Sequence, residues 1–155
     1  MFQPLYKYFS KNNYVYNSNI IKIKMIKTKC IFLPKNFQDG LRISVMSRHT
    51  LNDGKTPDLR INLSTYGLWM RSLAPPEYLV GDYYKRGLSW TEFEQKYLDH
   101  LRHSNVQTDV QSLAAQGMVS IITLLCVEKL PEYCHRRLLA EECKRYEPSL
   151  DLRIN

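Results

Sequence analysis

A nearly continuous apolar run at residues 118–126 constrains the fold of this chain more than any other feature. The run reads Met-Val-Ser-Ile-Ile-Thr-Leu-Leu-Cys, and four of its nine residues are β-branched. An amphipathic helix or a half-exposed strand would interleave polar residues regularly, whereas a strand buried on both faces is apolar almost throughout. Such strands occur in parallel sheets whose faces are covered by helices. The run therefore predicts an α/β fold.

Strand and helix patterns alternate along the rest of the chain. Ser89 and Glu92 form a capping box that predicts a helix start at Trp90. Gly117 is expected at the C′ position, just after the end of the next helix. The alternation predicts one small α/β domain with a mostly parallel sheet flanked by helices. Besides residues 118–126, the expected strands are 25–33, 41–46 and 150–154, and the expected helices are 77–85, 90–102, 108–116 and 131–146.

Residues 1–24 differ from the rest of the sequence. They are rich in Tyr, Asn and Lys, contain no acid and show no sustained periodicity. We interpret them as an N-terminal extension, either ordered, disordered or the product of a start site assigned too far upstream, and we expect the domain to occupy residues 25–155. Their four lysines carry more than half of the net charge of +7. Because a nucleic-acid-binding domain concentrates basic residues on its folded surface, nucleic acid is a possible but disfavoured partner.

The cysteines and the apolar segments predict where the protein is found. The N-terminus lacks the apolar core and small-residue cleavage site of a secretory signal, and no apolar run approaches the length of a membrane span. We therefore expect a cytoplasmic protein without a membrane partner. In that reducing setting the four cysteines are expected to be thiols.

The segment after the buried strand concentrates reactive side chains. It leads from the carboxyl end of that strand into the last helix, and this edge is where open α/β sheets bind ligands. The start of a helix also favours anions, because its first amides are unpaired. We expect one small volume to hold the candidate catalytic residues, which are Cys126, Glu128, Cys134 and His135.

Two arginines are candidate ligand-binding residues. Arg136 begins the helix beside His135, and Arg48 follows the second strand, so Arg48 joins the site if that strand lies beside residues 118–126. The leading hypothesis is an enzyme or binder of an anionic, phosphate-bearing small molecule. Arg136 and the helix start would hold the anion, His135 or Glu128 would move protons, and a cysteine would be the nucleophile.

Three alternatives stay open. Arg136 pairing with Glu128, together with a buried structural histidine, would make these residues structural. A non-enzymatic module that binds nucleic acid or protein is a further possibility, although the chain has no recognisable nucleic-acid motif. The glycine-rich loop of cysteine phosphatases is excluded, because no glycine lies between Cys126 and Arg136.

A metal site is the last alternative. Cys126, Cys134 and His135 offer donors that zinc or iron accepts, with Glu128 or water as a fourth ligand. Two features argue against it. The seven-residue gap between the cysteines is not the short spacing of a zinc knuckle. Adjacent residues on a helix also point about 100° apart, which separates Cys134 from His135.

The same segment resembles a known family. Leu-Leu-Cys-x-Glu-Lys at 124–129, a short gap with a proline, and Cys-His-Arg at 134–136 resemble the C-terminal signature of the bacterial and archaeal DUF488 family (domain of unknown function 488). Weaker resemblances are the Leu-Ala-Pro-Pro segment at 73–76, the capped helix from Trp90, and the start at Met25. Residues 48–65 depart from the pattern. The resemblance implies an α/β fold and brings no particular reaction, cofactor or partner with it.

Overall fold

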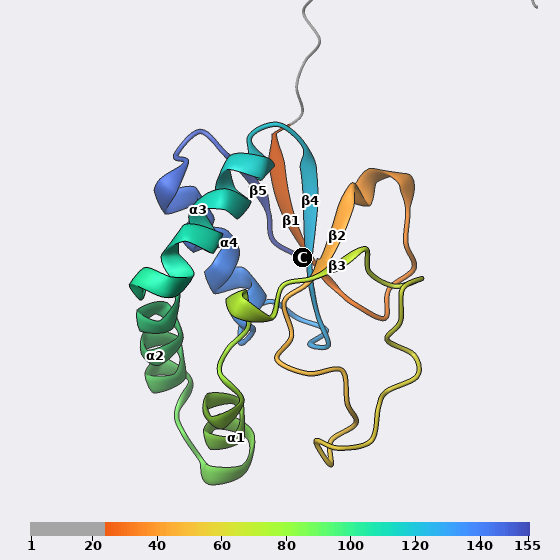
Figure 1. Ribbon diagram of the computed structural model, residues 1–155, viewed down its shortest axis with the longest axis vertical. Coiled ribbons are helices and arrows are strands. Elements are labelled where there is room, and N and C mark those ends of the chain that lie inside the picture. The colour runs from red at the N-terminus through yellow and green to blue at the C-terminus, as the bar shows by residue number, and fades with distance from the viewer. Residues whose placement is uncertain (1–23) are drawn as a thin grey trace, which may run out of the picture.

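The computed structural model describes residues 24–155 and contains one five-stranded parallel sheet (Figure 1). The strand order is β3-β2-β4-β1-β5. The apolar run forms the central strand, with β1 paired on one side and β2 on the other. All five strands run parallel, as predicted from the apolar run at residues 118–126. Their bounds are β1 Met25–Cys30, β2 Leu41–Ser44, β3 Leu68–Trp69, β4 Ile121–Cys126 and β5 Asp151–Arg153.

Four α-helices lie on one side of the sheet, and the short 3-10 helix η1 lies on the other (Figure 1). The apolar faces of the helices and the inward side chains of β1, β2 and β4 form the main core. No helix within residues 24–155 has the length and apolarity of a membrane crossing. The helices are α1 Glu77–Arg86, α2 Trp90–Arg102, α3 Ser104–Gly117 and α4 His135–Tyr146, with η1 at Phe37–Asp39 and η2 at Arg71–Leu73.

Local signals predicted several boundaries correctly. β1 begins at Met25, and Ser89 and Glu92 cap α2 reciprocally. Gly87 ends α1 in the left-handed conformation, with φ of 76°. The extension predicted at residues 1–24 lies outside the described residues, except for Lys24.

The role predicted for Gly117 is wrong. The helix does not stop before this residue, because the amide of Met118 still donates to the carbonyl of Ala114 at 3.1 Å. A Cβ at position 117 would lie 2.9 Å from the side chain of Ile26 and 3.1 Å from that of Leu150. The glycine therefore lets α3 approach β1 closely, and its backbone is not in the left-handed region.

The start predicted for α4 is also wrong. The helix begins at His135, four residues later than predicted, and Cys134 is extended with φ of −130° and ψ of 132°. Residues 131–134 form a turn in which the amide of Cys134 donates to the carbonyl of Pro131 at 3.1 Å. This turn keeps the carbonyls of Glu128 and Lys129 directed toward the guanidinium of Arg136. These hydrogen bonds from Arg136, together with the Cys134–Pro131 turn, thus replace the first helical turn that the proline suggested.

The other face of the sheet buries a polar cluster. Asp39 of η1 accepts hydrogen bonds from Arg42 of β2 at 2.6 Å and from Lys29 of β1 at 3.0 Å. Burial disfavours the charged carboxylate, but these hydrogen bonds outweigh it and hold the pKa of Asp39 below its ordinary value. The hydroxyl of Thr123 donates to the main-chain oxygen of Asp39 at 2.6 Å. The cluster fixes η1 across β1, β4 and β2.

Candidate functional site

A cavity of about 870 Å³ opens at the carboxyl ends of β4 and β2. One wall is the segment from Cys126 to His135, and the second is the loop after β2. The third wall is aromatic and comes from α1, α2 and the turn before α4. The lining residues used below are Arg48, Tyr83, Tyr84, Lys85, Trp90, Phe93, Cys126, Glu128, Tyr133, Cys134 and His135. The cavity therefore lies at the sheet edge where the sequence predicted a site.

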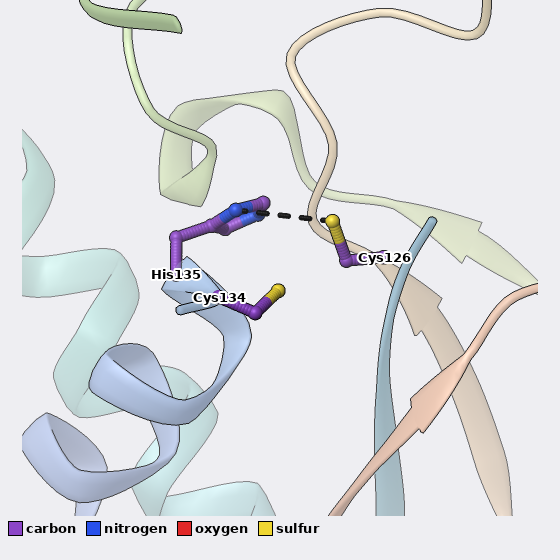
Figure 2. A group of neighbouring side chains, drawn as sticks. All are labelled: Cys126, Cys134 and His135. Atoms are coloured by element: carbon purple, nitrogen blue, oxygen red, sulfur yellow. Dashed lines mark hydrogen bonds between the residues drawn. The ribbon is translucent and has the colours of Figure 1, made fainter. Parts of the chain in front are cut away.

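Cys126 and His135 both line this cavity, and their side chains point toward each other (Figure 2). The sulfur of Cys126 lies 3.8 Å from Nδ1 of His135. Nε2 of the same ring lies 2.8 Å from the main-chain oxygen of Val45. Because a carbonyl only accepts hydrogen bonds, we assign the ring proton to Nε2, which leaves the lone pair of Nδ1 directed at the thiol. The ring is also packed edge-on against buried Tyr97, with 5.6 Å between centroids.

Cys134 completes a compact group of donors. Its sulfur, that of Cys126 and a ring nitrogen of His135 all lie within 4.8 Å of one another. The sequence argument that Cys134 and His135 point apart is wrong, because Cys134 is extended and does not lie on the helix. Its side chain instead points toward the other two (Figure 2).

The two thiols have different acidities. The pKa of Cys126 lies below the ordinary value, mainly because Cys134 donates a hydrogen bond to it, and the amide of Glu128 and the charge of Arg136 act in the same direction. These interactions outweigh burial, although the side chain is only 3% exposed. Burial raises the pKa of Cys134 well above the ordinary value, and its hydrogen bond to Cys126 adds to this. Cys126 is therefore the thiol that ionises first.

Glu128 points into the cavity and binds a residue that the sequence did not single out. The hydroxyl of Tyr84, on α1, donates to the carboxylate of Glu128. Burial raises the pKa of Tyr84, and the hydrogen bond to Glu128 raises it further, so this hydroxyl stays protonated. The pair connects α1 to the loop after β4. No sequence signal distinguishes Tyr84 from neighbouring Tyr83, which turns toward Trp90 and Phe93.

Arg136 is completely buried and does not line the cavity. Nη1 donates to the main-chain oxygen of Glu128 at 2.7 Å and to the sulfur of Cys134 at 3.2 Å. Nη2 donates to the main-chain oxygens of Lys129 at 3.4 Å and Asn155 at 3.1 Å. Arg136 therefore binds the main-chain oxygen of Glu128. The ion pair with the Glu128 side chain, which was one of the alternatives, is not formed. Its neighbour Arg137 pairs with Glu141 at the surface.

Arg48 meets the condition set by the sequence, because β2 pairs with β4 and Arg48 lines the cavity. Within residues 24–155 its guanidinium has no Asp or Glu partner at ion-pair distance, although Asp53 is close enough to feel its charge. Arg48 is thus a cation at the wall of the cavity, whereas Arg136, the other candidate ligand-binding residue, is buried away from it.

Comparison with known proteins supports the resemblance. The model of one family, described as the Active DUF488-N3 subclade, matches residues 26–147. No curated protein and no solved structure matches the sequence. The family match covers strands β2, β3 and β4, β1 except its first residue, the cavity walls and the Cys-x-Glu…Cys-His-Arg segment, and it ends before β5. The chain therefore belongs to the DUF488 family.

Proposed function

We propose that this protein is an enzyme that transfers a group from an anionic, phosphate-bearing small molecule through the thiolate of Cys126. The observation that carries the proposal is the 2.8 Å contact between Nε2 of His135 and the main-chain oxygen of Val45, from which the tautomer is assigned. Since the Nε2 proton is engaged by the oxygen of Val45, Nδ1 is the nitrogen that accepts the proton of Cys126. A thiol with an oriented base beside it, at the wall of a cavity, is the arrangement of a cysteine nucleophile.

The chemistry begins with a proton transfer. Cys126 gives its proton to Nδ1 of His135, and the resulting thiolate accepts hydrogen bonds from the thiol of Cys134 and the amide of Glu128. The thiolate attacks the electrophilic atom of the substrate and forms a covalent adduct. The imidazolium then returns the proton to the leaving group. A water molecule or another hydroxyl acceptor, whose proton His135 removes, attacks the adduct, takes the group and releases the thiolate of Cys126. The hydroxyl of Tyr84 stays protonated and donates its hydrogen bond to Glu128, so it positions that carboxylate at the cavity wall.

The cavity wall suggests the class of substrate. Arg48 and Lys85 supply positive charge for an anionic group, and neither has a carboxylate partner at ion-pair distance within the described residues. The wall also carries three carboxylates, of which Asp58 pairs with Arg60 and Glu128 accepts from Tyr84, whereas Asp53 lies near Arg48. Tyr133, Trp90 and Phe93 supply a broad aromatic surface, on which a planar or apolar part of the substrate can pack. Because the mechanism needs a free thiol, we expect it to operate in the reducing cytoplasm.

Competitive alkylation of the purified full chain tests the proposal. Cys126 should react faster with iodoacetamide than buried Cys143, whose pKa burial raises to about 12, as measured by mass mapping. His135→Ala should slow the reaction of Cys126 on the order of 100-fold at neutral pH, because the base is lost. Equal rates for Cys126 and Cys143 would refute a nucleophilic role.

Iodoacetate separates the anion site from the nucleophile. Arg48→Met should slow alkylation of Cys126 by anionic iodoacetate and leave the rate with neutral iodoacetamide unchanged. Lys55→Met, on the same loop but absent from the cavity wall, is the matched control. If Arg48→Met affects both reagents equally, charge is not what the cavity recognises.

A metal-dependent reaction is the second candidate, and the group of three donors favours it. Two thiolates and one imidazole within 4.8 Å of one another suit zinc. The hydrogen bond from Nε2 to the oxygen of Val45 is the type of contact that orients a histidine ligand. Cys126, Cys134 and Nδ1 of His135 would hold the ion, which would act as a Lewis acid on a substrate in the cavity.

Zinc binding distinguishes this candidate from the first. Protein purified without chelator should contain one zinc per chain by mass spectrometry, and zinc should protect Cys126 from alkylation. Cys143→Ser should retain the zinc, whereas Cys134→Ser should lose it. Unprotected alkylation in excess zinc would exclude the metal site.

A further inference from the structure

We propose that Cys134 is a resolving thiol, so that Cys126 and Cys134 cycle through an intramolecular disulfide and the protein exchanges thiols with anionic low-molecular-weight disulfides. This inference rests on the nucleophilic role of Cys126 proposed above. It adds the chemical class of a substrate and a role for the second cysteine, which the group-transfer mechanism uses only as a hydrogen-bond donor.

The two sulfurs are already within 4.8 Å of each other. Cys126 ends β4, and Cys134 follows it after a turn that lies outside both the strand and the helix. The extended backbone of Cys134 leaves its χ1 free of the restriction that a preceding helical turn imposes. A side-chain rotation of Cys134, with a small shift of the turn, therefore brings its sulfur to Cys126 while the sheet keeps Cys126 in place.

Cys134 also has the groups that a resolving thiol needs. Nη1 of Arg136 donates to its sulfur at 3.2 Å, which stabilises the thiolate that forms during resolution. A ring nitrogen of His135 lies within 4.8 Å of its sulfur, and the rotation of Cys134 brings the two within reach of a proton transfer. Arg136 lies outside the cavity lining, so the reacting group that it contacts is this thiol and not the substrate.

The reaction balances in two exchange steps. The thiolate of Cys126 attacks one sulfur of the small disulfide, the sulfur–sulfur bond breaks, and one thiolate leaves with the proton held by His135. Cys134 then gives its proton to His135, and its sulfur attacks the sulfur of Cys126. The mixed disulfide breaks, and the second thiolate leaves with that proton. The dithiol is oxidised to one disulfide and the small disulfide is reduced to two thiols.

Glutathione disulfide is a suitable probe, because it is a low-molecular-weight disulfide that carries carboxylates. The reduced full chain is mixed with an excess of the probe, quenched with acid and analysed by intact mass and peptide mapping. We expect the wild type to lose two hydrogen atoms, to link the peptides of Cys126 and Cys134, and to release two glutathiones per chain. Dithiothreitol should reverse the change.

Serine variants separate the two cysteines. Cys134→Ser should stop at a stable glutathione adduct on Cys126, and Cys126→Ser should leave Cys134 unmodified. Cys143→Ser, at a buried cysteine outside the site, should behave like the wild type. Unchanged melting temperatures show that the variants are folded.

The outcomes also separate this inference from the proposed function. A stable glutathione adduct on wild-type Cys126 would overturn the resolving role and leave the nucleophile intact. An outcome in which glutathione disulfide leaves both thiols unmodified, while iodoacetamide alkylates Cys126 selectively, would likewise overturn only the exchange reaction. If iodoacetamide shows no preference for Cys126, both proposals fail.

Discussion

Replacing Arg136 tests whether this residue stabilises the fold or binds a ligand. The side chain is completely buried, and its four hydrogen bonds connect α4 to the loop after β4, to Cys134 and to the main chain of Asn155. Methionine fills most of the same volume but donates no hydrogen bond. Arg136→Met should therefore destabilise the protein without opening a large cavity.

The magnitude follows from the contacts that are lost. Hydrogen bonds from a charged donor contribute about 1.5–3 kcal/mol each. Two of the Arg136 bonds, at 2.7 and 3.1 Å to main-chain oxygens, are short enough to count fully. Part of this loss is offset, because methionine buries no charge. We expect a decrease of about 3 kcal/mol in the free energy of unfolding. For a chain of this size, the melting temperature should fall by about 6–12 °C.

Urea unfolding followed by circular dichroism measures the effect. Arg137→Met is the matched control, because its partly exposed guanidinium pairs with Glu141 and Glu94 and donates to the main chain of Glu132, and we expect a change within about 1 kcal/mol. If Arg136→Met has the stability of the control, the buried hydrogen bonds do not support the loop. If it is equally stable and also loses affinity for phosphate compounds, Arg136 is the ligand-binding residue that the sequence suggested.

Three further predictions concern the fold. Burial alone would raise the pKa of Glu142, but hydrogen bonds from Arg102 and Arg145 outweigh it and hold the pKa below 4.5. The ionised carboxylate therefore stabilises the fold above the pKa of the unfolded chain, and this stability is lost as the pH falls through the lower pKa of the folded protein. The difference in melting temperature between the wild type and Glu142→Gln should therefore shrink in acid. A difference that stays constant with pH would contradict this. Gly117→Ala should cost about 1–3 kcal/mol in urea unfolding through its clash with Ile26, and wild-type stability would show that α3 moves freely. Deletion of residues 1–24 should leave the melting temperature unchanged, and a large decrease would place the domain boundary upstream of Met25.

The sequence predicted those parts of the fold that depend on local patterns. An uninterrupted apolar run identified the central strand, and reciprocal capping by Ser89 and Glu92 identified the start of α2. Prediction from the sequence failed where the same residue type is compatible with two different local conformations. A glycine near a helix end marks either a left-handed cap or a close approach, and Gly117 is the second. A proline suits a first helical turn, yet at Pro131 the tertiary contacts of Arg136 require a turn.

The candidate site was predictable to the extent that its residues are close in sequence. Cys126, Cys134 and His135 surround one strand-to-helix connection, so an α/β fold alone brings them to one sheet edge. Their partners come from elsewhere. Tyr84 reaches Glu128 from α1, across 44 residues, and the oxygen of Val45 reaches His135 across 90 residues. Neither contact can be predicted from the sequence. The first is made by Tyr84, which the sequence does not distinguish from adjacent Tyr83, and the second is made by a main-chain oxygen.

The contact with Val45 shows that sheet register determines the chemistry of the site. The amide of Val45 donates to the main-chain oxygen of Leu125 at 3.1 Å, which continues the β2–β4 ladder one residue beyond β2. The ladder thus fixes the carbonyl of Val45 beside Cys126, and that carbonyl accepts a hydrogen bond from Nε2–H of His135. A shift of β2 by one residue would reverse the side chains of β2 and move this carbonyl away. Either ring nitrogen could then carry the proton, and Nδ1 would no longer be held as the acceptor for the thiol. The pairing of two strands therefore sets which nitrogen faces the nucleophile.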